Sequence, residues 1–154
     1  VMNLYVQLLA YIMLITPFSL FWHELGHVFA AYLMRARHII LTVGFGKPII
    51  QGTLGHVTFE IRRIFLFNSY TRIEASTSLS NKDKVIITSM GPIFSLLLSL
   101  LAYVLNLLIV KHLIWYILCL FNLWLGIINL IPFRIKGKQS DGYTILQTIK
   151  NKYD

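Results

Sequence analysis

The sequence contains few charged residues. Of its 154 residues, 13% are charged and 56% are hydrophobic. A soluble domain usually carries about 25% charged residues. A chain with this composition could not cover its apolar surface with polar side chains in water. The shortage of charge therefore argues against an ordinary soluble fold and indicates that much of the surface faces lipid.

Cysteine and acidic residues are also scarce. The one cysteine, Cys119, has no partner within the chain for a disulfide, and its apolar surroundings predict a small buried side chain. Six residues are acidic. Any acid–base or metal chemistry that needs a carboxylate must use one of them: Glu24, Glu60, Glu74, Asp83, Asp141 or Asp154.

The basic residues outnumber the acids and give a formal net charge of +8. A nucleic-acid-binding protein would gather such residues on a soluble face. Here they lie between and beside long apolar runs, as expected for residues that flank membrane spans. We therefore expect membrane lipid, and no nucleic acid, among the partners. Because the first basic residue is Arg35, the basic start of a secretory signal is missing, and no cleavable signal is expected.

Three apolar segments approach or exceed the roughly 20 residues that a helix needs to cross a bilayer. They cover about residues 4–32, 85–110 and 113–131. Lys111 and His112 form a short turn between the last two segments, which predicts an antiparallel helical hairpin.

The stretch at about residues 39–73 has a different texture. It is rich in Ile, Val, Thr and Phe and is interrupted by Gly44, Gly46, Gly52 and Gly55, which predicts short strands with turns. An open sheet edge cannot face lipid, so this segment should lie at the membrane surface or pack against the helices in a protein-lined cavity. A polar connector is expected at residues 76–84. The predicted fold is a mostly α membrane protein of one domain, residues 1–154, with three transmembrane helices and a small β-sheet after the first.

The first apolar segment contains the motif His23-Glu24-Leu25-Gly26-His27. Residues four apart share one face of a helix, so the two histidines can bind one metal ion together. Zinc in such a site acidifies the water it binds, and Glu24 lies where it can take the proton. Ionisable residues inside a membrane span are costly and indicate function by default. The motif therefore predicts metal-dependent hydrolysis.

A catalytic zinc needs a third protein ligand and an open position. Asp141 follows the third span and precedes Gly142. It should lie at the same depth as the two histidines, which are in the inner half of the first span. An alternative is that Asp141 caps a helix at residues 143–151, because Asp is a favoured N-cap. Glu60, in the predicted strands, is expected to be a solvated charge, and His56 a surface loop histidine.

These residues resemble the site-2 protease family of intramembrane metalloproteases, peptidase family M50. Three landmarks occur in the family's order across nearly the whole chain. The first is the His-Glu-x-x-His motif in a transmembrane helix. The second is Gly91-Pro92 near the start of the next span. The third is Asn129-Leu130-Ile131-Pro132 followed by Asp141-Gly142.

The resemblance implies a catalytic core of three transmembrane helices, with zinc held by His23, His27 and Asp141 and with Glu24 as the general base. It also implies cleavage of a protein substrate's transmembrane segment near the cytoplasmic side. Asn129 would shape the site or hold the substrate backbone, and a membrane partner could regulate access.

The sequence departs from the family pattern in two ways. The family often has an asparagine a few residues after Gly-Pro, where this chain offers Ser95 as a smaller polar group. The spacer from Pro132 to Asp141 is also longer than usual. No PDZ-like domain is present in these residues, so the chain resembles a minimal member.

Two other functions are compatible with parts of the pattern. A different class of membrane metalloprotease with the same motif takes a glutamate as third ligand, but the second and third predicted spans contain no glutamate. A catalytically inactive relative could act as a membrane-bound binding or regulatory protein, which the intact His-Glu-x-x-His and Asp-Gly motifs argue against.

The distribution of basic residues predicts the orientation in the membrane. With the N-terminus outside, thirteen of the fourteen Lys and Arg residues fall on the inner side, and only Lys111 falls outside. We expect an integral, multi-pass protein of a bacterial cell membrane with a cytoplasmic C-terminus. A reporter fused after Asp154 should be active in the cytoplasm, whereas activity of a periplasmic reporter would contradict the charge argument.

Overall fold

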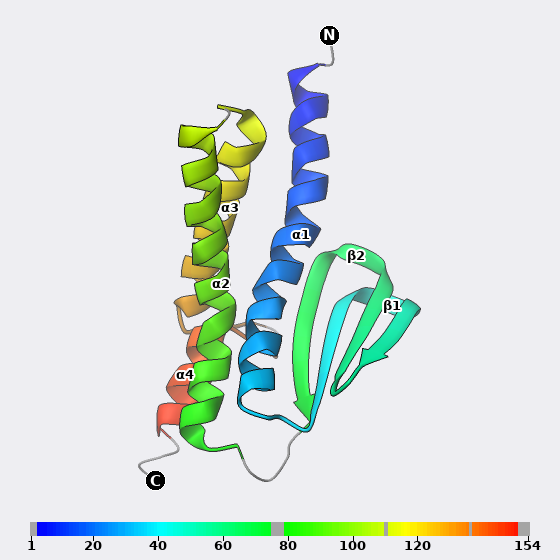
Figure 1. Cartoon of the computed structure of the whole chain (residues 1–154), viewed down its shortest axis with the longest axis vertical. Coiled ribbons are helices and arrows are strands. Elements are labelled where there is room, and N and C mark those ends of the chain that lie inside the picture. Colours follow the sequence, from blue (N-terminus) through cyan, green and yellow to red (C-terminus); the bar gives the residue numbers. More distant parts are fainter. Residues whose placement is uncertain (1–2, 75–78, 110, 136, 151–154) are drawn as a thin grey trace.

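The computed structural model describes residues 3–74, 79–109, 111–135 and 137–150, without the side chains of 65–68 and 74. Three long helices stand side by side, and a small sheet lies against the lower half of the first (Figure 1). The elements are α1 (Leu4–Leu33), β1 (His38–Leu54), β2 (Val57–Glu74), α2 (Asn81–Leu108), α3 (Leu113–Leu130), β3 (Arg134–Ile135), β4 (Lys138–Gln139) and α4 (Asp141–Lys150).

α1, α2 and α3 are long and apolar enough to cross a membrane. Large apolar side chains are exposed along all three, for example Leu14, Leu100 and Leu123, and such outward-facing surface suits lipid better than water. The described part of the chain therefore confirms the three predicted spans and the sheet between the first and second. The last residue of the predicted second span, Val110, lies outside the described residues.

The start of α2 differs from the prediction. Residues 81–84 were expected in a polar connector but form the first turn of the helix. Ser80 and Asp83 form a capping box in which each side chain accepts a hydrogen bond from the other residue's backbone N–H. The hydrogen bonds from Ser80 also hold the pKa of Asp83 below its usual range. Capping thus extends the helix into polar sequence. Residues 76–78 of the predicted connector lie outside the described residues.

Small residues let the helices approach one another closely. A Cβ on Gly26 of α1 would collide with the backbone carbonyl of Met90 in α2, and a Cβ on Gly126 of α3 would lie 2.8 Å from the Leu96 side chain. Close backbone approach at small residues is typical of helices packed in membranes. The contact at Gly26 fixes the His-Glu-x-x-His turn of α1 against the middle of α2.

A buried polar pair joins α1 to α3. The Asn122 side-chain amide donates to Ser19 Oγ at 2.8 Å, and both side chains are fully buried. Buried polar groups are costly unless they are hydrogen-bonded. This pair therefore sets the relative position of α1 and α3 near the middle of both helices.

The sheet consists of the two long, bent strands β1 and β2. Residues 38–43 pair with residues 69–74 on one side and with residues 57–61 on the other. Residues 48–54 pair with residues 57–62. Among the described residues, the 69–74 segment has a strand partner along one edge only, and this end of β2 runs beside α1 (Figure 1).

The predicted long spacer between Pro132 and Asp141 forms the small β3–β4 hairpin, and α4 then runs back along α2 (Figure 1). Gly142 makes this return possible, because a Cβ there would collide with the carbonyl of Leu130 at the end of α3. The start of α4 is therefore held directly against the end of α3.

Candidate active site

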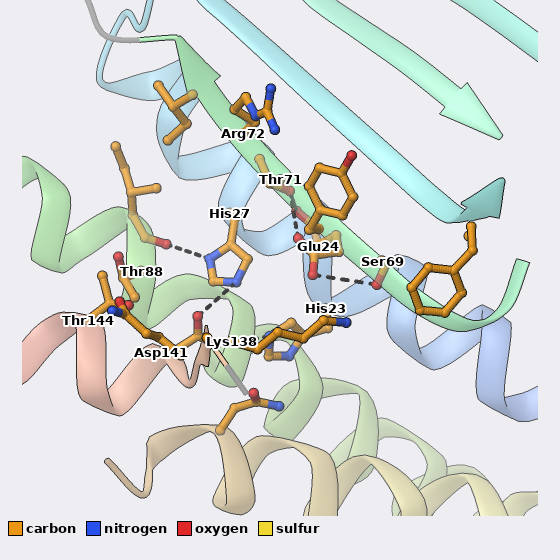
Figure 2. Close-up of a pocket in the computed structure, with 18 of the residues that line it drawn as sticks. His23, Glu24, His27, Ser69, Thr71, Arg72, Thr88, Lys138, Asp141 and Thr144 are labelled. Carbon is orange, nitrogen blue, oxygen red and sulfur yellow. Dashed lines mark hydrogen bonds and ion pairs between the residues drawn. The ribbon is translucent and has the colours of Figure 1, made fainter. Parts of the chain in front are cut away.

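His23 and His27 lie one turn apart on α1, with ring centroids 5.1 Å apart. Both are buried, with 5% and 8% of their surface exposed, and Glu24 between them is 8% exposed. Burial of three ionisable side chains on one helical turn is unfavourable unless each has polar partners. The structure supplies such partners from α2, β2 and α4 (Figure 2).

One nitrogen of each histidine is held by α2. His27 Nδ1 lies 2.9 Å from the carbonyl oxygen of Ile87, and His23 Nδ1 lies 2.9 Å from Ser95 Oγ. A carbonyl only accepts, so His27 Nδ1 carries a proton, and Nε2 is the nitrogen that would bind a metal once it is deprotonated. A second partner of this kind orients metal-binding histidines. Ser95 thus provides the polar group that the sequence suggested after Gly91-Pro92.

The other nitrogen of each histidine faces Asp141. Asp141 Oδ2 lies 3.1 Å from His23 Nε2, and Oδ1 lies 3.5 Å from His27 Nε2. Burial opposes ionisation of this carboxyl, but the hydrogen bonds and charges of the two histidines outweigh burial and hold its pKa below the usual range. Asp141 is therefore ionised at neutral pH, the state in which a carboxylate binds a metal.

Ser140 caps α4 and leaves the Asp141 side chain free for this contact. Ser140 Oγ accepts from the backbone N–H of Tyr143 at 3.1 Å and of Phe133 at 3.0 Å, and it donates to the carbonyl of Ile131 at 2.7 Å. These bonds satisfy the start of the helix and tie it to the chain leaving α3. The alternative of Asp141 as the N-cap is therefore wrong.

Glu24 is held by the sheet. Thr71 Oγ1 donates to Glu24 Oε2 at 2.7 Å, and Ser69 Oγ lies 3.5 Å from Oε1 (Figure 2). Ser69 and Thr71 alternate with Tyr70 along β2, so both point to the same face of the strand. The carboxylate of Glu24 is thereby held beside the histidines with its own hydrogen-bond donors.

Two donor sets could bind a metal here. His23, Glu24 and His27 each offer an atom within 4.8 Å of the others, and Asp141 faces the same two imidazole nitrogens. Asp141 is the better third donor, because each of its oxygens already points at one histidine, whereas Glu24 is engaged by Thr71. Two nitrogens and one carboxylate oxygen suit a catalytic zinc.

Gly91 provides the space beside these donors. A Cβ at this position would collide with His27 Nε2 and would lie 2.7 Å from His23 Nε2. Any side chain would therefore occupy the region that both imidazole nitrogens face. The absence of a side chain at Gly91 and the chemistry of the three donors together fit a zinc ion.

A cleft of about 850 Å³ opens over this cluster. Its walls come from α1, β1, β2, α2 and the segment from Gly137 to Thr144 (Figure 2). Asn129 also lines it, and because its amide nitrogen donates to the carbonyl of Leu125 at 2.9 Å, its side-chain oxygen is left to accept.

The other acidic and histidine candidates lie elsewhere. Glu60 is paired with Arg62 at 3.0 Å, and His56 is an exposed residue in the turn between β1 and β2. Neither lines the cleft. His56 is exposed, as expected for a loop histidine, whereas Glu60 was expected to be a solvated charge and instead has a side chain that is 18% exposed and paired with Arg62.

Several site residues were not found from the sequence. Ser69 and Thr71 hold Glu24 from 45 and 47 residues away. The alternation of Ser69, Thr71 and Ile73 could have assigned them to one face of a strand. No local pattern, however, identifies which helix that face meets.

The donor geometry predicts the effect of removing Asp141. Asp141→Asn should reduce the zinc content of the purified protein severalfold, because an amide replaces the carboxylate whose two oxygens each face one histidine. Metal analysis of the protein, with Glu60→Gln as the matched control, measures this. Full zinc in Asp141→Asn together with loss in Glu60→Gln would mean that the sheet supplies the ligand.

Comparison with known proteins agrees with these observations. The family model for peptidase family M50 matches residues 10–114, which include the His-Glu-x-x-His motif. A protein of Campylobacter jejuni named "Putative zinc metalloprotease Cj1068" is 26% identical over 106 residues. The alignment covers 59% of this chain and 28% of that relative, so the chain spans less than a third of its length. The family match covers most of the chain, and the chain belongs to peptidase family M50.

Proposed function

We propose that this chain is a site-2-type zinc metalloendopeptidase that hydrolyses peptide bonds in or near the transmembrane segments of membrane proteins. The observation that supports this proposal most strongly is the convergence of His23, His27 and Asp141 beside Glu24, between helices long enough to span a membrane. Membership of peptidase family M50 supports it independently.

The three donors would hold the metal, and Glu24 would move the proton. A zinc ion in this position supplies Lewis acidity, which acidifies water near neutral pH and polarises a peptide carbonyl. A carboxylate oxygen of Glu24 lies within 4.8 Å of an imidazole nitrogen of each histidine, where the carboxylate can accept a proton from the attacking water and pass it to the leaving amide nitrogen.

Thr71 and Ser69 orient Glu24 for this work. The hydrogen bond from Thr71 Oγ1 engages Oε2, one of the two carboxylate oxygens of Glu24. The carboxylate therefore acts as a base and not as a fourth ligand, which leaves the open position that a catalytic zinc requires. Burial excludes bulk water and strengthens these interactions.

The sheet beside the cleft offers a way to bind an extended substrate. Residues 69–74 have one edge without a strand partner among the described residues, and several of them line the cleft. An unwound peptide can add to such an edge through backbone hydrogen bonds. In the glycine-punctuated segment at residues 43–59, Gly44, Phe45 and Gly46 also line the cleft.

The position of the cluster along α1 favours cleavage near one side of the membrane. His23 and His27 lie in the second half of the helix, at the end where the sheet and α4 also lie (Figure 1). The distribution of Lys and Arg assigns this end to the cytoplasm. Peptide bonds near the cytoplasmic end of a substrate span would therefore be cut.

Replacing Glu24 tests the mechanism. Glu24→Gln should lower the cleavage rate of a single-span substrate by about 10²- to 10⁴-fold, because the amide cannot accept the proton. Zinc content and membrane insertion should remain unchanged. Rates can be compared after co-expression with candidate substrates, with Asp83→Asn, outside the cleft, as the control. Cleavage by Glu24→Gln at nearly the wild-type rate would refute this mechanism.

A further inference from the structure

The charged residues around the cleft fall into two groups. The two acids, Glu24 and Asp141, are engaged with Thr71 and with the histidines respectively. The remaining charged side chains that line the cleft, among the residues described, are all cationic. They are Arg62, Arg72 and Lys138.

These three cations come from different parts of the chain. Arg62 and Arg72 belong to the two halves of β2, and Lys138 belongs to the short strand β4. The unusually long spacer between α3 and α4 builds the hairpin that carries Lys138. Among the described residues that line the cleft, Lys138 is the cation that this hairpin contributes.

The positions of Lys138 and Arg62 are defined by contacts. Lys138 Nζ lies 5.1 Å from the centre of the Phe45 ring, which lines the same cleft. Arg62 donates to Glu60 from one terminal nitrogen at 3.0 Å, while its buried Nε has no hydrogen-bond partner among the residues that the structure describes. Pairing with Glu60 thus uses only part of the guanidinium.

An anion in the cleft would meet several donors at once. A guanidinium binds a carboxylate through two parallel hydrogen bonds, and an ammonium binds it as a point charge. A partly enclosed cleft strengthens such attraction compared with open water. The two acids of the site do not cancel this effect, because zinc would offset their charge.

We propose that Arg62, Arg72 and Lys138 are specificity-determining residues, which select a substrate segment with an acidic side chain close to the bond that is cut. This inference rests on the proposed protease function. The substrate class is thus a membrane protein with aspartate or glutamate beside the cleaved part of its span.

Binding of two synthetic peptides separates this inference from catalysis. The peptides span a membrane, share one sequence and carry either glutamate or glutamine on both sides of a central Gly-Pro. Their affinities for the Glu24→Gln protein are measured in phosphatidylcholine nanodiscs by fluorescence anisotropy. The glutamate peptide should bind about fivefold more tightly, a difference that a few partly exposed charge pairs can supply.

Substitutions then assign the preference to these residues. Arg72→Gln combined with Lys138→Gln should remove most of the difference, whereas Arg63→Gln, on the same strand but outside the cleft lining, should retain it. Lys138→Glu should favour a peptide with lysine in place of glutamate. This reversal cannot result from misfolding.

Three results would overturn the inference. The two peptides could bind equally well, or Arg63→Gln could abolish the preference as completely as the double variant. Third, substitution of these cations could change only the amount of anionic lipid that the protein retains when phosphatidylglycerol is added to the nanodiscs. That result would mean that the cations bind lipid headgroups. If the preference is present but the wild-type protein cuts neither peptide, the specificity stands and the protease function fails.

Discussion

The site depends on close backbone contact at three glycines. Gly26 lets α1 touch the backbone of α2, Gly91 leaves space beside the two imidazoles, and Gly142 lets α4 start against the end of α3. Packing of this kind leaves no room for adjustment, because a single methyl group at any of the three would collide with backbone or with a histidine ring. The donors therefore meet because α1 packs closely against α2, and α4 against the end of α3.

Hydrogen bonds offset the cost of burying these ionisable side chains in a low-dielectric environment. Ile87 and Ser95 hold one nitrogen of each histidine, and Thr71 holds Glu24. Each of these partners leaves one atom of the ionisable group facing the cleft. The same contacts that satisfy buried polar groups thus set which atom of each side chain is available for chemistry.

Part of the site could be predicted from the sequence, because some of its features are set by local spacing and because few residues could serve as the third donor. The spacing of His23 and His27 defines one helical face, and the scarcity of acids left Asp141 as the best-positioned carboxylate. The contacts of Thr71 with Glu24 and of Lys138 with Phe45 join segments far apart in the chain. β3 and β4 have two residues each, too few for any periodicity. Neither contacts between distant segments nor strands of two residues leave a pattern in the sequence.

The identity of the third metal donor can be measured most directly by zinc X-ray absorption. In the wild-type protein, the account predicts only nitrogen and oxygen neighbours, at about 2.0–2.2 Å. In Asp141→Cys, a thiolate would replace the carboxylate, and a sulfur neighbour at about 2.3 Å should appear. A zinc-loaded Asp141→Cys protein whose spectrum contains no sulfur, and is otherwise unchanged, would contradict the proposed ligand set.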